Sequence, residues 1–338
     1  MARHGSTRAF PGGLMRLAAT LMLALSFSAS LATPSTAADK LTVLLDWFVN
    51  PDHGPLVVAK EKGIFAAHDL EVTLIAPADP NDPPKLVAAG KADLAVGYQP
   101  QLTVQVAEGL PLVRVGTLVA TPLSALVVLA DGPVKTIADL KGRKVGYSVG
   151  GFEDAILGTM LKTNGLTLDD VTLVNVNFSL SPSLLSGRVD AVIGAYRNFE
   201  LNQMELEGSE GRAFFVEEEG VPPYDELILI ARRDRIEDPK LRRFVDAVEE
   251  ATQYVINHPD EAWEAFAASG DELDDELNRR AWADTLPRFA LRPAALDSNR
   301  YARFATFLKA QGLIPDALPV ESYAVELPTE SAGAMPDR

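Results

Sequence analysis

Short apolar segments alternate with amphipathic segments along the chain from about residue 40 onward. The apolar segments are rich in Val, Leu and Ile, as buried strands are, and the segments between them carry apolar residues at helical spacing. This alternation predicts βαβ units, an α/β fold and a parallel sheet. The first set of expected elements comprises strands at 40–47, 71–77, 92–98 and 111–119 and helices at 53–69, 82–91 and 100–109.

The alternation starts again near residue 124, and a second set of elements follows. Its expected strands lie at 124–131, 144–150, 171–177, 190–196, 213–219 and 226–234, and its helices at 136–142, 152–165, 181–188 and 199–208. Thr136 is suited to an N-cap and Gly165 to a helix C-terminus. Beyond residue 234 only helices are expected, at 238–258, 259–269, 274–286 and 297–312.

Both ends of the chain differ from this pattern. Arg3, Arg8 and Arg16 precede an apolar run at 17–32, and small residues follow it up to residue 38. This order of charged, apolar and small residues is typical of a secretory signal peptide, so we assign 1–38 to one and exclude it from the fold. Residues 331–338 are expected to form a loose C-terminal tail.

Charge and cysteine content narrow the function classes. The 338 residues include 31 basic and 47 acidic ones, for a net charge of −16, and without the three signal arginines the balance is 28 to 47, or −19. Such an excess of negative charge repels nucleic acid and anionic lipid, so neither is expected as a partner. The chain has no cysteine, which rules out disulfides, thiolate metal sites and thiol nucleophiles. An exported protein of this kind is expected in the periplasm.

Aromatic, carboxylate and amide side chains gather where the expected strands end, which is the edge at which open α/β sheets bind ligands. They are Asp46, Trp47, Asn50 and His53 after the first strand, Tyr98 after the third, and Phe152, Glu153, Tyr196 and Glu200 at two turns of the second set. Each has an ordinary structural explanation, because aromatics fill cores and an acid in a first helical turn complements the helix dipole. Glu200 would lie in such a turn if Asn198 caps its helix.

The joint pattern favours a binding pocket. Aromatic rings offer stacking faces, and ionised carboxylates only accept hydrogen bonds, so the set suits a flat, donor-rich ligand such as an amino-substituted heteroaromatic ring. A sulfonate or nitrate would need Arg, Lys or clustered N–H donors. Arg188 and Arg197 are the basic residues near these edges, and the sequence leaves open which way Arg197 faces.

The motifs at these positions resemble a periplasmic-binding-protein family that includes binders of thiamine-pyrimidine precursors and the fungal pyrimidine-precursor synthases. The resemblance covers about 39–327. It rests on Asp46, Trp47, Asn50 and His53 followed by "AKEKGIF", and on "VAAGKADLAVGYQPQ", "DLKGRKVGYSVGG" and "DAVIGAYRNFELNQ". Val49 departs from a frequent Pro, and Arg197 from a frequent bulky aromatic. The second departure bears on the identity of the ligand.

The resemblance implies a type II periplasmic binding fold with two α/β lobes and a ligand cleft between them. The chain would cross twice between lobes, giving lobe I at 39–125 plus 228–330 and lobe II at 126–227. Its bacterial members imply delivery of a formylaminomethyl- or hydroxymethyl-aminopyrimidine to the permease and ATPase of an ABC importer. A freely diffusing binding protein needs only to be a monomer, and no cofactor, metal or catalytic residue is expected. Trp47 and Tyr98 would line lobe I, and Tyr196 and Glu200 lobe II.

Two alternatives remain open on the sequence alone. A riboflavin, another flat vitamin-like molecule or an amidic solute would satisfy the same stacking faces and acceptors. The fungal relatives suggest instead a synthase that uses His53, with Lys85 near the region of a cofactor lysine. Against the synthase, the stretch where a cysteine cluster would fall reads "VPPYDELILIAR" and holds no cysteine.

Overall fold

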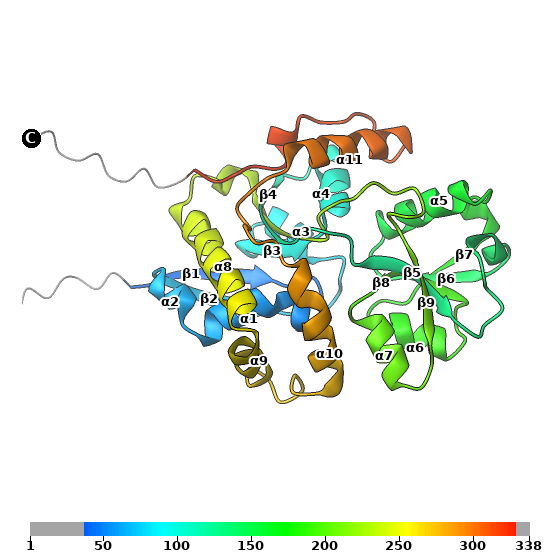
Figure 1. The fold of residues 1–338 in the computed structure, drawn as a ribbon. Coiled ribbons are helices and arrows are strands. Elements are labelled where there is room, and N and C mark those ends of the chain that lie inside the picture. The colour runs from blue at the N-terminus through cyan, green and yellow to red at the C-terminus, as the bar shows by residue number, and fades with distance from the viewer. Residues whose placement is uncertain (1–36, 329–338) are drawn as a thin grey trace, which may run out of the picture. The chain divides into compact units, whose positions relative to one another are not determined.

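The structure is a computed structural model that describes residues 37–328. The predicted tail and all but the last two residues of the predicted signal peptide lie outside the described residues. All helices and strands belong to one unit that begins at Ala38. The strands form two five-stranded sheets, and helices cover both faces of each sheet (Figure 1).

The first sheet has the strand order β2-β1-β3-β10-β4. Its strands are β1 (Asp39–Leu44), β2 (Leu70–Ile75), β3 (Leu94–Gly97), β4 (Leu112–Val119) and β10 (Leu227–Arg232). The second sheet has the order β7-β6-β8-β5-β9. Its strands are β5 (Ser124–Leu129), β6 (Lys144–Tyr147), β7 (Thr172–Asn175), β8 (Ala191–Tyr196) and β9 (Gly211–Phe215). We call the parts built on these sheets lobe I and lobe II.

Both sheets are mixed, so the expected parallel pairing holds for only part of each sheet. Strand β10 lies antiparallel between β3 and β4, and β5 lies antiparallel between β8 and β9. These two strands are the ones that the chain enters directly after passing from one sheet to the other, so no crossover helix sets their direction. The ends at which β5 and β10 begin therefore lie at the same sheet edge as the carboxyl ends of the strands beside them.

Alternating side chains explain why each sheet is covered on both faces. Along β10, Ile228 and Ile230 pack with α3 and α4, whereas Leu227 and Leu229 belong to the cluster that contains α1 and α8. In lobe II, one face of the sheet packs on α5 and the other on α6 and α7. Strands that are buried on both faces read as continuous apolar runs, which is why the sequence revealed them.

The helices follow the predicted order, with a few changes at their ends. They are α1 (Gly54–Glu61), α2 (Ile64–Ala67), α3 (Pro83–Ala88), α4 (Gln99–Ala107), α5 (Glu153–Thr163), α6 (Leu180–Leu185), α7 (Glu200–Leu206), α8 (Pro239–Asn257), α9 (Pro259–Ala267), α10 (Glu276–Thr285) and α11 (Ser298–Ala310). The helix expected at 53–69 is broken because Gly63 adopts φ +73°, a left-handed conformation that stops α1. Thr136 caps its helix as predicted, but that helix is a short 3-10 segment, Ile137–Leu140.

Two passages connect the lobes. The chain leaves lobe I after β4 and enters β5, and it returns after β9 into β10. We call residues 120–123 the first crossover and 221–226 the second crossover. The lobe boundaries at 125/126 and 227/228 stay a prediction. Within 37–328, no helix is both long and apolar enough to cross a membrane.

Candidate functional site

A pocket lies where the two sheets present the ends of their strands, and both lobes line it. The space between its walls, counted together with the part that opens to solvent, is about 500 Å³. The lining residues are Asp46, Trp47, Asn50, Asp52, Tyr98, Ser124, Phe152, Glu153, Leu180, Gly194, Tyr196, Phe199, Glu200 and Glu226. Five of these carry carboxylates and none is Lys or Arg. The pocket is therefore built to accept hydrogen bonds or positive charge.

Asp46 organises the lobe I wall. Its Oδ1 lies 2.9 Å from His53 Nε2, and its Oδ2 accepts a hydrogen bond of 2.9 Å from the Tyr98 hydroxyl. The Asn50 N–H donates to His53 Nδ1 at 3.3 Å, so the neutral imidazole carries its proton on Nε2 and donates it to Asp46. Both Asp46 oxygens thus have protein donors, and the carboxylate fixes the Tyr98 ring against the pocket.

Glu153 stands at the start of α5 in lobe II. Its Oε2 accepts hydrogen bonds from the backbone N–H groups of Ser148, at 2.7 Å, and Val149, at 3.1 Å. The same carboxylate lies directly over Gly194 of β8, where an added Cβ would come within 2.3 Å of Oε1. Gly194 also has φ +90°, so only glycine meets both requirements.

Glu200 is the first residue of α7, and its Oε2 accepts a 2.6 Å hydrogen bond from the Tyr196 N–H. The turn between β8 and α7 is therefore closed by the glutamate itself. The predicted N-cap role of Asn198 was wrong, because Phe199 occupies that position. The Asn198 side chain instead donates to Asp52 Oδ1 of lobe I at 2.7 Å.

Asp52 connects the lobes at the pocket floor. Besides Asn198, the Thr285 hydroxyl lies 3.1 Å from Asp52 Oδ1, while Oδ2 is buried and has no partner among the described residues. A buried acceptor without a donor is costly, and a ligand that supplies one would relieve that cost.

Four of the pocket carboxyls have raised pKa values because burial disfavours their charged forms. Burial raises the pKa of Glu153 and of Glu200 to about 8, that of Glu226 to about 7 and that of Asp52 to about 6. Hydrogen bonds from backbone N–H groups oppose the shift at the three glutamates, and Asn198 and Thr285 oppose it at Asp52. No guanidinium or ammonium lines the pocket to neutralise these groups.

Aromatic rings from both lobes meet around the pocket. The Tyr98 ring lies 5.0 Å from that of Phe152, and Trp47 contacts Phe178 edge to face at 4.6 Å. Phe48, beside Trp47, is 42% exposed and lies 5.8 Å from Phe199. These pairs join the lobes, and Tyr98, Phe152 and Trp47 give the pocket apolar walls on which a flat ring can stack.

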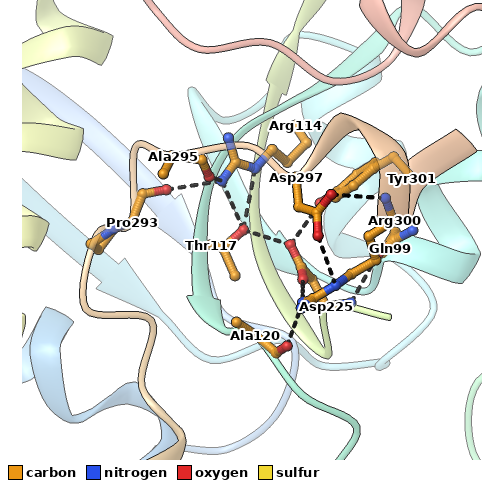
Figure 2. Close-up of polar contacts among 10 residues, drawn as sticks. All are labelled: Gln99, Arg114, Thr117, Ala120, Asp225, Pro293, Ala295, Asp297, Arg300 and Tyr301. Atoms are coloured by element: carbon orange, nitrogen blue, oxygen red, sulfur yellow. Dashed lines mark hydrogen bonds and ion pairs between the residues drawn. The ribbon is translucent and has the colours of Figure 1, made fainter. Parts of the chain in front are cut away.

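A buried polar network holds the second crossover to lobe I (Figure 2). Asp225 Oδ2 accepts hydrogen bonds from the hydroxyls of Thr117, at 2.9 Å, and Tyr301, at 3.2 Å. Arg114 is fully buried, and its Nη2 donates to Thr117 at 2.8 Å and to the Pro293 carbonyl at 2.9 Å. Because an unpaired guanidinium in the core would be very costly, these partners fix the position of Arg114 and, through Thr117, of Asp225.

Arg300 of α11 fastens both crossovers at once. Its Nη1 donates to Asp225 Oδ1 at 2.6 Å and to the Ala120 carbonyl at 2.5 Å. Gln99 adds a second attachment, since its Oε1 accepts from the Asp225 N–H at 2.8 Å. Contacts from α11 and α4 therefore hold both connections between the lobes on the lobe I side.

Most of the residues predicted for the site lie together. Asp46, Trp47, Asn50, Tyr98, Phe152, Glu153, Tyr196 and Glu200 all line the pocket. His53 does not, because it is fully buried behind Asp46 with both ring nitrogens hydrogen-bonded. Whether these residues contact a ligand stays a prediction.

The sequence reasoning missed Asp52, Ser124, Leu180, Gly194, Phe199 and Glu226. Ser124 is the first residue of β5 and Glu226 directly precedes β10, whereas the sequence prediction considered only the carboxyl ends of strands. In mixed sheets the antiparallel strands β5 and β10 begin at the pocket edge. Asp52 lies within the stretch "DWFVNPDH", so its position alone could have drawn attention to it.

Two basic residues considered from the sequence lie away from the pocket lining. Arg197 forms a bidentate ion pair with Glu217, at 2.7 and 2.8 Å, and its guanidinium stacks 4.0 Å from the ring centroid of Phe215. Lys85 is exposed on α3. Neither supplies positive charge to the site.

Comparison with known proteins agrees with this architecture. The sequence pattern of the family described as "NMT1/THI5 like" matches residues 50–262. The chain belongs to the NMT1/THI5-like family. A thiamine biosynthesis protein of Haemophilus influenzae is 58% identical over 298 residues, covering 88% of this chain and 95% of that protein.

Two further relatives of this NMT1/THI5-like protein carry different names. The formylaminopyrimidine-binding protein of Halalkalibacterium halodurans is 35% identical over 79% of this chain and 83% of its own length. A 4-amino-5-hydroxymethyl-2-methylpyrimidine phosphate synthase of Legionella pneumophila is more distant, at 26% identity over 81% of this chain and 88% of that protein.

Solved structures of low sequence identity share the fold. The alkanesulfonate-binding protein SsuA from Xanthomonas axonopodis, bound to MOPS, superposes with a TM-score of 0.68 at 16% identity, covering 86% of this chain and 99% of that one. The periplasmic nitrate-binding protein NrtA from Synechocystis gives a TM-score of 0.65 at 16% identity, with 86% of both chains covered. The fold is thus the two-lobed type II periplasmic binding fold.

Proposed function

We propose that this protein is the solute-binding component of an ABC importer and that it binds a pyrimidine precursor of thiamine, such as a formylaminomethyl- or hydroxymethyl-aminopyrimidine. The observation that carries this proposal is the pocket itself. Five carboxylates and several aromatic rings line it, and no Lys or Arg does. An aminopyrimidine matches these walls because it is flat, apolar on both faces and bears N–H donors at its edge.

The charge of the pocket separates this ligand class from those of the structural neighbours. A sulfonate or a nitrate is an anion and needs cationic or N–H donors. Here, each of Glu153, Glu200 and Glu226 already uses the backbone donors nearest to it. An anion placed among these acceptors would meet electrostatic repulsion and unsatisfied lone pairs. The fold is therefore shared with the anion binders, while the proposed ligand class follows from the pocket and the relatives.

We expect the protein to act by binding alone. The relative in Halalkalibacterium halodurans is named for binding formylaminopyrimidine, and the synthases are more distant relatives. His53, the residue that a synthase-like reaction would use, is buried and hydrogen-bonded through both nitrogens. Residues 1–38 would direct the protein to the periplasm, where it would present the closed form to a permease and its ATPase.

Glu200 is the residue we expect to accept the ligand amino group in lobe II. Its Oε2 is held by the Tyr196 N–H, which orients the carboxylate and leaves Oε1 for the ligand. Glu200→Gln should weaken binding of 4-amino-5-hydroxymethyl-2-methylpyrimidine by about 1–3 kcal/mol, because the one amide oxygen is needed by the Tyr196 N–H and an NH₂ group then faces the ligand. Titration calorimetry measures this loss directly.

The matched control is Glu207→Gln, the same change at an exposed position that immediately follows α7. It should bind the pyrimidine as the wild type does. An unchanged affinity of Glu200→Gln would remove Glu200 from the site, and no binding by the wild type would contradict the proposed ligand.

A further inference from the structure

Glu226 differs from the other pocket carboxylates in what it holds. It is 1% exposed, ends the second crossover and lines the pocket. Its Oε2 accepts hydrogen bonds from the N–H groups of Leu123, at 2.7 Å, and Ser124, at 2.9 Å. These two residues end the first crossover and begin β5. One carboxylate oxygen therefore ties the two connections between the lobes to each other.

The first crossover is held from its other side by lobe II. The Leu123 carbonyl accepts hydrogen bonds from the Arg197 N–H, at 3.0 Å, and from Arg197 Nε, at 3.3 Å. Arg197 is fixed in turn by its ion pair with Glu217. Residues 123 and 124 thus lie between a carboxylate on the lobe I side, which binds their N–H groups, and a guanidinium of lobe II, which binds a carbonyl.

The residue before Glu226 is anchored firmly in lobe I. This residue, Asp225, is held there by Thr117, Tyr301 and Arg300 (Figure 2). The contacts of Asp225 therefore hold the backbone next to Glu226 in lobe I.

The second oxygen of Glu226 lies near Tyr196, a residue of lobe II that also lines the pocket. Oε1 lies 3.5 Å from the Tyr196 hydroxyl of lobe II, at the outer limit of hydrogen bonding. Oε2 is already bound to two N–H groups, and the Tyr224 hydroxyl also lies near this carboxylate. Oε1 has only the long contact with Tyr196, so it is the oxygen we expect a donor in the pocket to reach.

Building on the proposed function, we propose that Glu226 contacts the ligand and couples occupancy of the pocket to closure of the lobes. In this arrangement, Oε1 accepts a hydrogen bond from the amino group of an aminopyrimidine while Oε2 keeps the first crossover in the closed position. Glu226 would then be a specificity-determining residue, because a ligand without a donor at this point could fill the pocket but not hold the crossover.

The test combines titration calorimetry with amide hydrogen exchange on the full chain. The probes are 4-amino-5-hydroxymethyl-2-methylpyrimidine and its analogue with hydrogen in place of the 4-amino group. Glu226→Gln can still accept from Leu123 and Ser124 through its amide oxygen, but it turns an NH₂ group toward the pocket. It should lose about tenfold or more in affinity for the amino probe, while the ligand-free exchange rates of the Leu123 and Ser124 amides stay close to wild type.

Two further variants complete the design. Glu226→Ala should lose affinity and also speed up exchange at Leu123 and Ser124, because nothing then holds their N–H groups. Glu218→Gln, the same change at an exposed residue of the preceding segment, should alter neither quantity. Binding of the amino probe should slow exchange at Leu123 and Ser124 in the wild type and in Glu218→Gln, but not in Glu226→Gln.

The outcomes separate this inference from the proposed function. If the wild type binds the amino probe and Glu226→Gln binds it equally well, the inference is wrong and the proposed function stands. If hydrogen exchange at the Leu123 and Ser124 amides is unchanged in Glu226→Ala, Glu226 does not hold the first crossover, whichever ligand the protein binds. A wild type that binds neither probe would overturn the proposed function and the ligand contact of Glu226 together.

Discussion

At the scale of single residues, the pocket requires a residue without a Cβ at position 194, because the Glu153 carboxylate lies directly against Gly194. An added Cβ at Gly194 would come within 2.3 Å of Glu153 Oε1 and 2.5 Å of its Cδ. Glu153 has little room to retreat, because its Oε2 is bound to the N–H groups of Ser148 and Val149. A glycine in β8 thus allows a carboxylate to lie flat on the sheet.

Gly194→Ala should therefore destabilise the protein beyond the cost of its backbone conformation. Gly151 is a matched control, because it also has φ +90° but an added Cβ there would meet nothing within 4 Å. Gly151→Ala should cost about 1–2 kcal/mol from the left-handed conformation alone, and Gly194→Ala clearly more. Urea unfolding measures the stability of both variants. Equal losses of unfolding free energy would show that the clash with Glu153 adds nothing to the cost of Gly194→Ala.

The pocket residues were partly predictable because the chemistry lies in short turns of the sequence. Asp46, Trp47 and Tyr98 follow strands that could be recognised from their apolar runs. Their hydrogen bonds were not predictable, since Tyr98 reaches Asp46 from 52 positions away. His53 was predicted beside the other site residues, but it does not line the pocket. The sequence does not reveal that its imidazole is buried against Asp46.

At the scale of helices and strands, the clearest feature is that α11 holds both crossovers. Arg300 donates to Ala120 of the first crossover and to Asp225 of the second. The apolar pattern predicted α11 itself, but it could not predict that a polar residue on this helix would reach the connections between the lobes.

Removing this guanidinium should weaken the whole fold. Arg300→Ala leaves the buried Asp225 carboxylate without its charged partner, so we expect a loss of about 1–3 kcal/mol in unfolding free energy. Arg303→Ala, an exposed arginine on the same helix, should stay within about 0.5 kcal/mol of wild type. Chemical denaturation followed by circular dichroism distinguishes the two. Similar small losses in both variants would contradict the role of Arg300.

Strand direction is where prediction from the sequence failed at this scale. Alternating strands and helices indicate parallel βαβ units, and β1, β2 and β3 do pair in parallel. The apolar runs of β5 and β10 look the same in sequence, yet they pair antiparallel because the chain enters them from the other lobe. The error matters for function, because it hid Ser124 and Glu226 from the search.

At the scale of the whole molecule, the buried acids make stability depend on pH. The pKa values of Glu153 and Glu200 rise to about 8 from an ordinary value of 4.5. The folded protein therefore keeps these protons at pH values where the unfolded chain has released them. Stability from these groups is fully present below about pH 4.5 and is lost as the pH rises toward 8.

We therefore expect the ligand-free protein to lose on the order of a few kcal/mol of stability between pH 5 and pH 8. Glu153→Gln, which is neutral throughout, should show a smaller decline, and Glu218→Gln, altered at an exposed site, the full decline. Urea unfolding at intervals of one pH unit gives the slopes. A wild type whose stability is flat or rises over this range would contradict the assignment of buried, protonated acids.

The central claim is that the acid-lined pocket binds an aminopyrimidine, and a thermal-shift screen of residues 39–338 tests it most directly. The panel comprises formylaminopyrimidine, 4-amino-5-hydroxymethyl-2-methylpyrimidine, thiamine, riboflavin, taurine and nitrate. A ligand at 100 times its Kd adds about 2.7 kcal/mol of stability, which gives a measurable rise in Tm. The account predicts this rise with an aminopyrimidine and none with taurine or nitrate. A rise with either anion, or with riboflavin alone, would contradict it.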